Sequence, residues 1–375
     1  MKVLTKRIGI LIFLQIVSVT AFQENNFEIK VWADLDMHVS MDPEYIDILN
    51  KKCAECGYKS LFRNSDTNAL FEVYPVLQSK IPYMSLGTFP TPVEKLHTLS
   101  ARYGTHIFVK QDSLSGGKDA QGFRLYGGNK VRKLEFLLAQ ARVLGATKVL
   151  TFGCVGSNHA VATAAYARHL GMQPICMLKH QPPSPGVQRN LLRHLTYKSE
   201  LHYSSTNEIR NVHALTVWLE HYKRDGYVPY IIPTGGSNVY GTLGFVNAAF
   251  ELAAQIQQGL LPKPTHIYVP CGSCGTTAGL VLGCKAVGLD VQVVAVAVEP
   301  DEEPGFAHTV DTLFKQTNAY LHALDATFPL CSYTEYDLLI DQRFTGSGYG
   351  VSTPEAFQAA HEAYEAEQII LDATY

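Results

Sequence analysis

A surplus of charge of either sign is missing from this 375-residue chain, because 31 Lys and Arg residues nearly balance 34 Asp and Glu residues. The formal net charge is −3, and neither a basic stripe nor an acidic tail appears in the sequence. Proteins that bind nucleic acid carry such a concentration of positive charge. The sequence therefore predicts no nucleic-acid partner and favours a small-molecule ligand.

Two common nucleotide-binding motifs are also missing. The sequence has no Gly-x-x-x-x-Gly-Lys run, which argues against a nucleotide triphosphatase. No Gly-x-Gly-x-x-Gly follows the first expected strand with an acidic residue about twenty positions later, which argues against a dinucleotide site.

Apolar runs long enough to span a membrane are missing as well. The stretch from Ile8 to Val19 is almost wholly apolar, but it is well short of the roughly 20 residues that a membrane helix needs. Positive charges precede this stretch, and small residues end it at Ala21, as in a secretory signal. We predict a signal peptide over residues 1–21, export to the periplasm or the medium, and no stable membrane span after cleavage. An uncleaved anchor is the alternative, and a protein that does not use the signal stays in the cytoplasm.

The eight cysteines include two pairs with the same Cys-x-x-Cys spacing. If the protein is exported, Cys53 and Cys56 are the pair that we expect to be oxidised. The second pair, Cys271 and Cys274, invites a four-thiolate zinc site. We reject that site because the second pair lies in a glycine-rich turn and neither pair has further His or Cys residues beside it. The sequence thus predicts no metal.

Short β-branched apolar runs alternate with amphipathic helical stretches from about Thr105 onward. We expect strands over residues 106–110, 148–153, 174–179, 230–233, 266–270 and 291–298. The intervening helices include residues 132–144, 158–170 and 276–287. The alternation is typical of a doubly wound α/β protein with mostly parallel sheets. Ligands gather at the carboxyl ends of such strands, so the strand-to-helix turns are the places to seek chemistry.

The first informative turn contains a lysine at the start of an expected helix. Paired glycines precede Asn129, which lies near the helix cap, and Lys130 follows at the positively polarised helix start. A lysine in that place has a reason to lose its proton and act as a nucleophile that forms a Schiff base. The alternative is that Lys130, Arg132 and Lys133 form the solvated face of the helix.

The second turn, residues 151–160, again joins a strand to a helix through glycine. Free N–H groups at the helix start, with Ser157 and Asn158 beside them, suit a carboxylate such as that of an α-amino acid. Ser157 as a simple N-cap is an equal alternative. His159 is compatible with either a substrate contact or a buried histidine of the first helical turn.

The third turn, residues 269–280, is a row of small residues between a strand and a helix. Its backbone N–H groups and the hydroxyls of Ser273, Thr276 and Thr277 form a phosphate cradle without a lysine. A phosphate site, an activated lysine and a carboxylate pocket in one α/β chain together indicate pyridoxal 5'-phosphate acting on a small amino acid.

The run Gly-Gly-Asn-Lys-x-Arg-Lys-Leu-Glu and the region from about Leu70 to the C-terminus resemble the family of 1-aminocyclopropane-1-carboxylate deaminase and D-cysteine desulfhydrase. This resemblance implies the tryptophan-synthase-β fold (fold type II), with two doubly wound open-sheet domains. It also implies a homodimer. We expect an N-terminal extension over 22–75, a large cofactor-binding domain over 76–132 and 244–375, and a small domain over 133–243.

The resemblance also implies roles for individual residues. Lys130 matches the Schiff-base lysine, and Asn158 matches the residue that binds the ring hydroxyl of the cofactor. Ser157, Asn158 and His159 then lie at the substrate carboxylate, and Ser157 has a catalytic role. Tyr349 and Tyr375 match tyrosines that flank the cofactor and relay protons. The phosphate loop is Ser273, Cys274, Gly275, Thr276 and Thr277.

Three departures from the family pattern bear on substrate and completeness. Cys154-Val155-Gly156 replaces the usual Gly-Ile-Gln before Ser157, so the loop that faces the substrate differs. His159 is typical of the desulfhydrase-like members, where the cyclopropane deaminases have Gln. The chain ends at Tyr375, whereas relatives continue into the segment that supplies the partner of the pyridine nitrogen, so we expect a truncated C-terminus.

The sequence therefore predicts a pyridoxal-phosphate-dependent lyase or deaminase. The favoured reaction is α,β-elimination of D-cysteine to pyruvate, hydrogen sulfide and ammonia. Deamination of 1-aminocyclopropane-1-carboxylate is the alternative within the family. A catalytically inactive binding protein that keeps the fold is the alternative from another class.

Overall fold

The computed structural model describes residues 68–119, 121–301 and 304–372. The expected signal peptide, most of the N-terminal extension, the Cys53–Cys56 pair and Tyr375 lie outside these residues. No helix within them is long and apolar enough to cross a membrane.

The first sheet has four parallel strands in the order β5-β4-β3-β6. Its strands are β3 (Lys148–Cys154), β4 (Gln173–Lys179), β5 (Glu200–Ser204) and β6 (Tyr230–Ile232). The connecting helices are α8 (Asn158–His169), α9 (Pro185–Thr196) and α10 (Asn207–Asp225). Every residue of β3 is buried, which explains its continuous apolar run. The edge strand β5 was not predicted, because its alternating polar residues do not give that signal.

The second sheet has three parallel strands in the order β7-β8-β9. They are β7 (His266–Cys271), β8 (Gln292–Ala297) and β9 (Leu338–Asp341), and the last was also not predicted. Helices α11 (Val239–Gln257), α12 (Gly275–Ala286) and α13 (Phe306–Leu324) pack beside this sheet. The two parallel sheets and their crossover helices confirm the expected α/β class.

One expected strand has a different place from the others. The segment predicted over 106–110 forms only β2 (Phe108–Lys110), which pairs antiparallel with β1 (Val93–Lys95) in a sheet of its own. The connection between these two strands contains the short helix α6 (His97–Tyr103). The remaining elements are the 3₁₀ turns η2 (Asp112–Ser115) and η3 (Thr234–Gly236) and the helices α4 (Ala69–Val73), α5 (Pro75–Gln78) and α14 (Pro354–Glu367).

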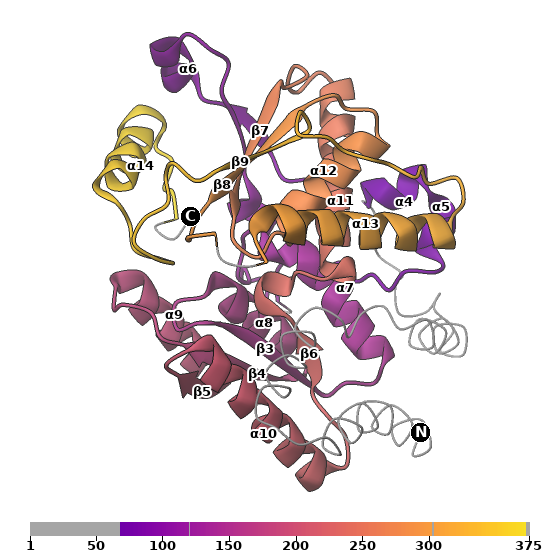
Figure 1. The fold of residues 1–375 in the computed structure, drawn as a ribbon, viewed down its shortest axis with the longest axis vertical. Helices are drawn as coiled ribbons and strands as arrows, with labels where there is room; N and C mark the ends of the chain where they lie inside the picture. Colours follow the sequence, from indigo (N-terminus) through magenta and orange to yellow (C-terminus); the bar gives the residue numbers. More distant parts are fainter. Residues whose placement is uncertain (1–67, 120, 302–303, 373–375) are drawn as a thin grey trace.

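The helix α7 (Lys130–Val143) runs through the middle of the molecule, between the two sheets (Figure 1). All of its residues except Arg142 are buried, and it packs on α11 in the main apolar core. A solvated face for Lys130, Arg132 and Lys133 is therefore wrong, because these side chains are only 7%, 1% and 0% exposed.

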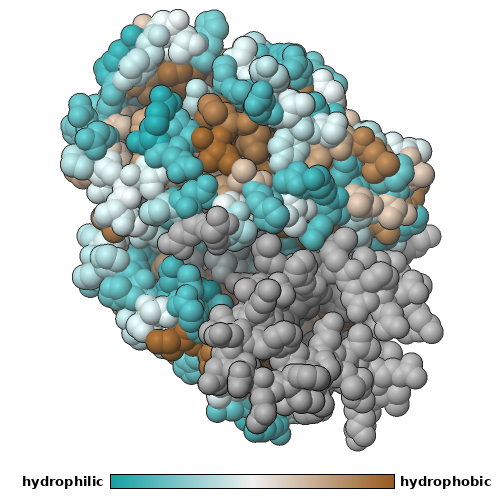
Figure 2. Space-filling view, viewed as in Figure 1, coloured by the Kyte–Doolittle hydropathy of each residue, from teal (hydrophilic) through white to brown (hydrophobic). Residues whose placement is uncertain are grey.

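The opposite face of the second sheet is less well covered. Figure 2 shows apolar side chains gathered over the strands β7 to β9, where Tyr268 and Leu339 are exposed. Parallel sheets are usually covered on both faces. This patch is thus the part of the second sheet that lacks a packed layer among the described residues.

Candidate active site

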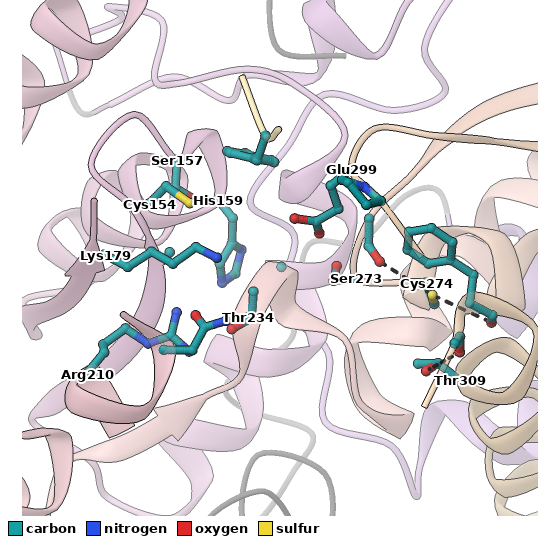
Figure 3. A pocket seen from close by; sticks show the side chains of 18 residues that line it. Cys154, Ser157, His159, Lys179, Arg210, Thr234, Ser273, Cys274, Glu299 and Thr309 are labelled. Atoms are coloured by element: carbon teal, nitrogen blue, oxygen red, sulfur yellow. Dashed lines mark hydrogen bonds between the residues drawn. The ribbon is translucent and has the colours of Figure 1, made fainter. Parts of the chain in front are cut away.

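The turns that follow the strands of both sheets meet at one cavity of about 320 Å³. The β3–α8 turn contributes Cys154, Ser157 and His159, and the β7–α12 turn faces it with Ser273 and Cys274 (Figure 3). The structure thus brings together the second and third turns that the sequence singled out. The other lining residues are Gly153, Lys179, Asn207, Arg210, Thr234, Gly235, Gly272, Glu299, Pro300, Gly305, Phe306, Thr309 and Tyr349.

Lys130 is the first residue of α7, as predicted, but the helix start is not the main influence on its amine. Asn129 occupies the N-cap without a side-chain hydrogen bond. Burial lowers the pKa of Lys130 to about 8, while the carboxylate of Asp372 opposes this shift. Roughly a tenth of the amine is therefore unprotonated at pH 7, far more than at the usual lysine pKa of 10.5, as a nucleophilic lysine requires.

Arg132 anchors the start of α7 in the core. Its guanidinium group donates to both oxygens of Asp112 at 2.8 and 2.9 Å and to both oxygens of Glu251 at 2.8 and 3.0 Å. Although burial opposes ionisation, Arg132 holds the pKa of Asp112 and of Glu251 below the usual range. This pairing explains how a helix start next to a reactive lysine tolerates a buried charge.

Lys133 is a residue whose position the sequence did not reveal. Its Nζ donates to the Gly235 carbonyl and to Ser237 Oγ, both at 3.0 Å. Ser237 Oγ in turn donates to Ser273 Oγ at 2.8 Å and accepts from the Gly275 N–H at 3.2 Å. The loop itself contains no lysine, but α7 brings Lys133 beside it from elsewhere in the chain.

The start of α12 has the features of an anion site. Cys274 is the N-cap residue with a left-handed φ of 64°, and its side chain makes no capping hydrogen bond. A Cβ atom on Gly275 would lie 2.6 Å from Ser237 Oγ and 2.9 Å from Lys133 Nζ, so glycine keeps this space open. The N–H groups of Gly275, Thr276 and Thr277 lie at the helix start, beside the Lys133 amine. These residues fit a phosphate group.

Ser157 and His159 lie on the wall of the cavity that belongs to the four-stranded sheet. Ser157 caps α8, since its Oγ accepts from the Ala160 N–H at 3.2 Å. Thr151 Oγ1 donates its only proton to the Ile232 carbonyl at 3.0 Å, so His159 Nε2, 2.9 Å away, donates to Thr151. Burial and the nearby Lys130 hold the pKa of His159 well below its usual value. His159 is thus a neutral imidazole with its lone pair on Nδ1.

Asn158 lies where α8 meets the C-terminal segment. Its Oδ1 accepts from Tyr126 at 2.9 Å and from Asn190 at 3.0 Å, and its Nδ2 donates to Asp372 Oδ2 at 3.0 Å. Asp372 was not predicted as a site residue, although it belongs to the C-terminal run that drew attention through Tyr375. Tyr349 lines the cavity, half-buried, on the segment after β9.

Other cavity residues had no motif to reveal them. Lys179 ends β4, Arg210 lies in the first turn of α10, and Glu299 follows β8. The only available signal was position, because each of them follows or ends a strand, or opens the next helix, at the carboxyl edge of a parallel sheet.

Comparisons with known proteins place this chain among relatives of known name. The D-cysteine desulfhydrase of Klebsiella pneumoniae strain 342 is 31% identical over 304 residues, which cover 79% of this chain and 86% of that protein. The mitochondrial protein of Arabidopsis thaliana named bifunctional D-cysteine desulfhydrase/1-aminocyclopropane-1-carboxylate deaminase is 31% identical over 299 residues, covering 78% and 70% of the two chains.

A solved structure described as an ACC deaminase homologue superposes with a TM-score of 0.68 at 32% identity, covering 81% of this chain and 86% of the other. This likeness confirms the expected fold type. The family model described as pyridoxal-phosphate dependent enzyme matches residues 84–374. The chain therefore belongs to the family of pyridoxal-phosphate-dependent enzymes.

Proposed function

We propose that the protein binds pyridoxal 5'-phosphate through Lys130 and eliminates a leaving group from a small amino acid, with D-cysteine as the favoured substrate. The single observation that carries the proposal is the position of a buried, partly deprotonated lysine near an anion site that contains a second lysine. The names of the relatives support the same reaction class.

In this proposal each turn has one task. The start of α12, including Ser273, Cys274, Gly275, Thr276 and Thr277, holds the phosphate with help from Lys133. Asn158 contacts the cofactor ring, and Ser157 and His159 hold the substrate carboxylate. The bound cofactor would act as the electron sink that makes the α-proton of the substrate acidic.

The remaining steps belong to the side chains of this chain. The Lys130 amine takes the α-proton, which it can do because burial favours its neutral form. Tyr349 lines the cavity and would return or relay a proton, and Tyr375 has the same assigned role. For D-cysteine, the Cβ–S bond breaks with its electron pair on sulfur, and water completes the balance to pyruvate, ammonia and hydrogen sulfide.

Deamination of 1-aminocyclopropane-1-carboxylate is the second candidate, supported by the names of two relatives. This substrate has no α-proton, so Lys130 could not start the reaction in the same way. The two activities separate cleanly in an assay, because only D-cysteine releases sulfide.

The decisive experiment is reconstitution with pyridoxal phosphate followed by substrate assays. We expect an absorbance band near ~410–430 nm that Lys130→Ala abolishes, as cofactor chemistry requires of a lysine-bound cofactor. D-Cysteine, L-cysteine and the cyclopropane acid are then compared by release of keto acid, ammonia and sulfide. A protein that binds cofactor but turns over none of them would support the inactive binding protein instead. A protein without the band would overturn both.

We also infer export through the N-terminal signal and assembly as a homodimer. The charged and apolar pattern of residues 1–21 supports export, and the exposed apolar side chains over β7 to β9 leave a surface for a second copy. N-terminal sequencing of the mature protein tests cleavage near Ala21. Sedimentation of the purified protein tests the dimer, and a monomer at all concentrations would contradict it.

A further inference from the structure

Two cationic side chains on the cavity wall formed by the four-stranded sheet and its helices have no task in the reaction as described. Figure 3 shows Lys179 and Arg210 directed into the cavity on the side of His159 and Thr234, with Glu299 on the opposite wall. A small neutral substrate such as cysteine needs no such pair. The two cations therefore bear on which amino acid the cavity accepts.

Arg210 is held in place by its surroundings. Its Nε and Nη2 donate to Asn211 Oδ1 at 3.3 and 3.0 Å, and its guanidinium carbon lies 5.1 Å from the centre of the Phe152 ring. The residue is only 4% exposed. A guanidinium group kept in one orientation at a cavity wall is suited to bind an anion with planar, directional hydrogen bonds.

Lys179 reaches the same wall from the neighbouring strand end. Its backbone is fixed between Cys154 of β3 and Ser204 of β5 in the register of the sheet. Within the described part of the chain, its ammonium group makes no hydrogen bond or ion pair in the structure. It is half-buried, and with Arg210 it lies near the carboxylate of Glu208 on α10.

Lys179, Arg210 and Glu299 all affect the pKa of the Cys154 thiol. Burial raises its pKa to about 11, while Lys179 and Arg210 oppose the rise and Glu299 adds to it. The three charges thus lie close enough to act on one point of the cavity. The two cations favour an anion at the wall of the four-stranded sheet, and Glu299 disfavours an anion at the opposite wall.

The strand ends place the cations beside the Ser157 turn. Lys179 is the register partner of Cys154, so β4 ends next to the end of β3 that leads to Ser157. An amino acid with an anionic group attached through Cβ carries two negative groups. One group would meet the Ser157 turn and the other would meet the cations.

We propose that Lys179 and Arg210 form a subsite for a second anionic group, so that the substrate class is an α-amino acid with an anionic leaving group on Cβ. This inference rests on the proposed elimination and specifies its substrate. The α-proton goes to Lys130, the Cβ–X bond breaks with its electron pair on X, and the cations receive the departing anion. Water then gives the keto acid and ammonia; for O-phosphoserine the products are pyruvate, ammonia and phosphate.

The test compares kcat/KM for O-phosphoserine and cysteine, each as both enantiomers, in the reconstituted protein. In Lys179→Met we expect the ratio of the phosphoserine value to the cysteine value to fall about tenfold or more, as for loss of a charged hydrogen bond. The control variant Lys223→Met removes an exposed lysine from the far end of α10, the helix that carries Arg210. It should leave the ratio unchanged. Arg210→Gln should lower the ratio in the same direction as Lys179→Met.

Three outcomes would overturn the subsite. One is cysteine turnover without turnover or inhibition by O-phosphoserine. The second is an equal loss for both substrates in Lys179→Met, which would assign the cations to the α-carboxylate. The third is an equal change of the ratio in Lys179→Met and Lys223→Met. If no amino acid is turned over, the proposed function fails, and calorimetric binding of O-phosphoserine against serine still tests the subsite by itself.

Discussion

Asn158 Nδ2 lies 3.0 Å from Asp372 Oδ2, which joins the start of α8 to the C-terminal segment across 214 positions of the chain. Because Tyr126 and Asn190 both donate to Asn158 Oδ1, the amide nitrogen is fixed toward Asp372. The same carboxylate raises the pKa of Lys130 against the effect of burial. The C-terminal segment therefore acts on the reactive lysine although no turn motif contains it.

The first prediction concerns the pH dependence of Lys130. Because only the neutral amine attacks an aldehyde, the rate at which the apoprotein develops the ~410–430 nm band should rise with pH through about 8. Asp372→Asn removes a charge that raises the pKa, so the midpoint should move to lower pH. Stopped-flow absorbance measures both rates.

The same shift has a consequence for stability. The folded-state pKa lies below the usual 10.5, so the unfolded chain binds more protons between pH 8 and 10.5, and the apoprotein should gain stability as the pH rises through that window. Lys130→Met should lack this gain. Equal pH profiles for the two proteins in chemical denaturation would contradict the buried amine.

The second prediction assigns Lys133 to the phosphate. Lys133→Met should raise the Kd for pyridoxal phosphate about tenfold or more, because a hydrogen bond to the charged phosphate is lost. Pyridoxal, which lacks the phosphate, is the matched ligand, and its affinity should change much less. Equilibrium titration of the apoprotein followed by fluorescence gives both constants. A parallel loss for the two ligands would show that Lys133 only supports the fold.

The third prediction uses two glycines with the same backbone strain. Gly235 and Gly259 have φ values of 63° and 76°, but only at Gly235 would a Cβ atom collide, 1.9 Å from Ser273 Oγ. Both Ala variants should lose about 1 kcal/mol of stability from the left-handed φ. Only Gly235→Ala should also weaken pyridoxal phosphate binding, since it displaces the loop. Equal cofactor affinity in the two variants would argue against Ser273 at the phosphate.

The fourth prediction concerns the buried ion pairs of Arg132. Arg132→Met leaves Asp112 without its cation and Glu251 with Lys110 alone, and it should cost about 3–5 kcal/mol of unfolding free energy. Arg102→Met breaks the exposed pair with Glu362 and should cost less than about 1 kcal/mol. Urea denaturation compares them. Partial recovery in Arg132→Met with Asp112→Asn would identify the orphaned carboxylate as the cause, whereas no recovery would point to lost packing.

The sequence was sufficient for features that depend on local pattern. The alternation of apolar runs placed the strands β3, β4, β6, β7 and β8, and the glycine turns placed Lys130 and Ser157 at helix starts. The edge strand β5 was missed because its polar residues interrupt the continuous apolar run of a central parallel strand. The strand β9 was missed because it is only four residues long. The segment over 106–110 gave the pattern of a strand but not the direction of its pairing.

The charged residues of the run from Lys130 to Glu135 show the limit of sequence analysis. Their identities and helical order follow from local pattern, because the chain alone specifies a helix start after two glycines. Their environments depend on the path of α7 between the two sheets. This path buries all of them and brings them to different hydrogen-bond partners. Arg132 meets carboxylates from η2 and α11, and Lys133 reaches the turn before α12. Burial lowers the pKa of both lysines, that of Lys133 well below its usual value. Which of them reaches the anion site was decided only by tertiary contacts, because burial and hydrogen-bond partners, rather than residue type, set the state and position of each amine.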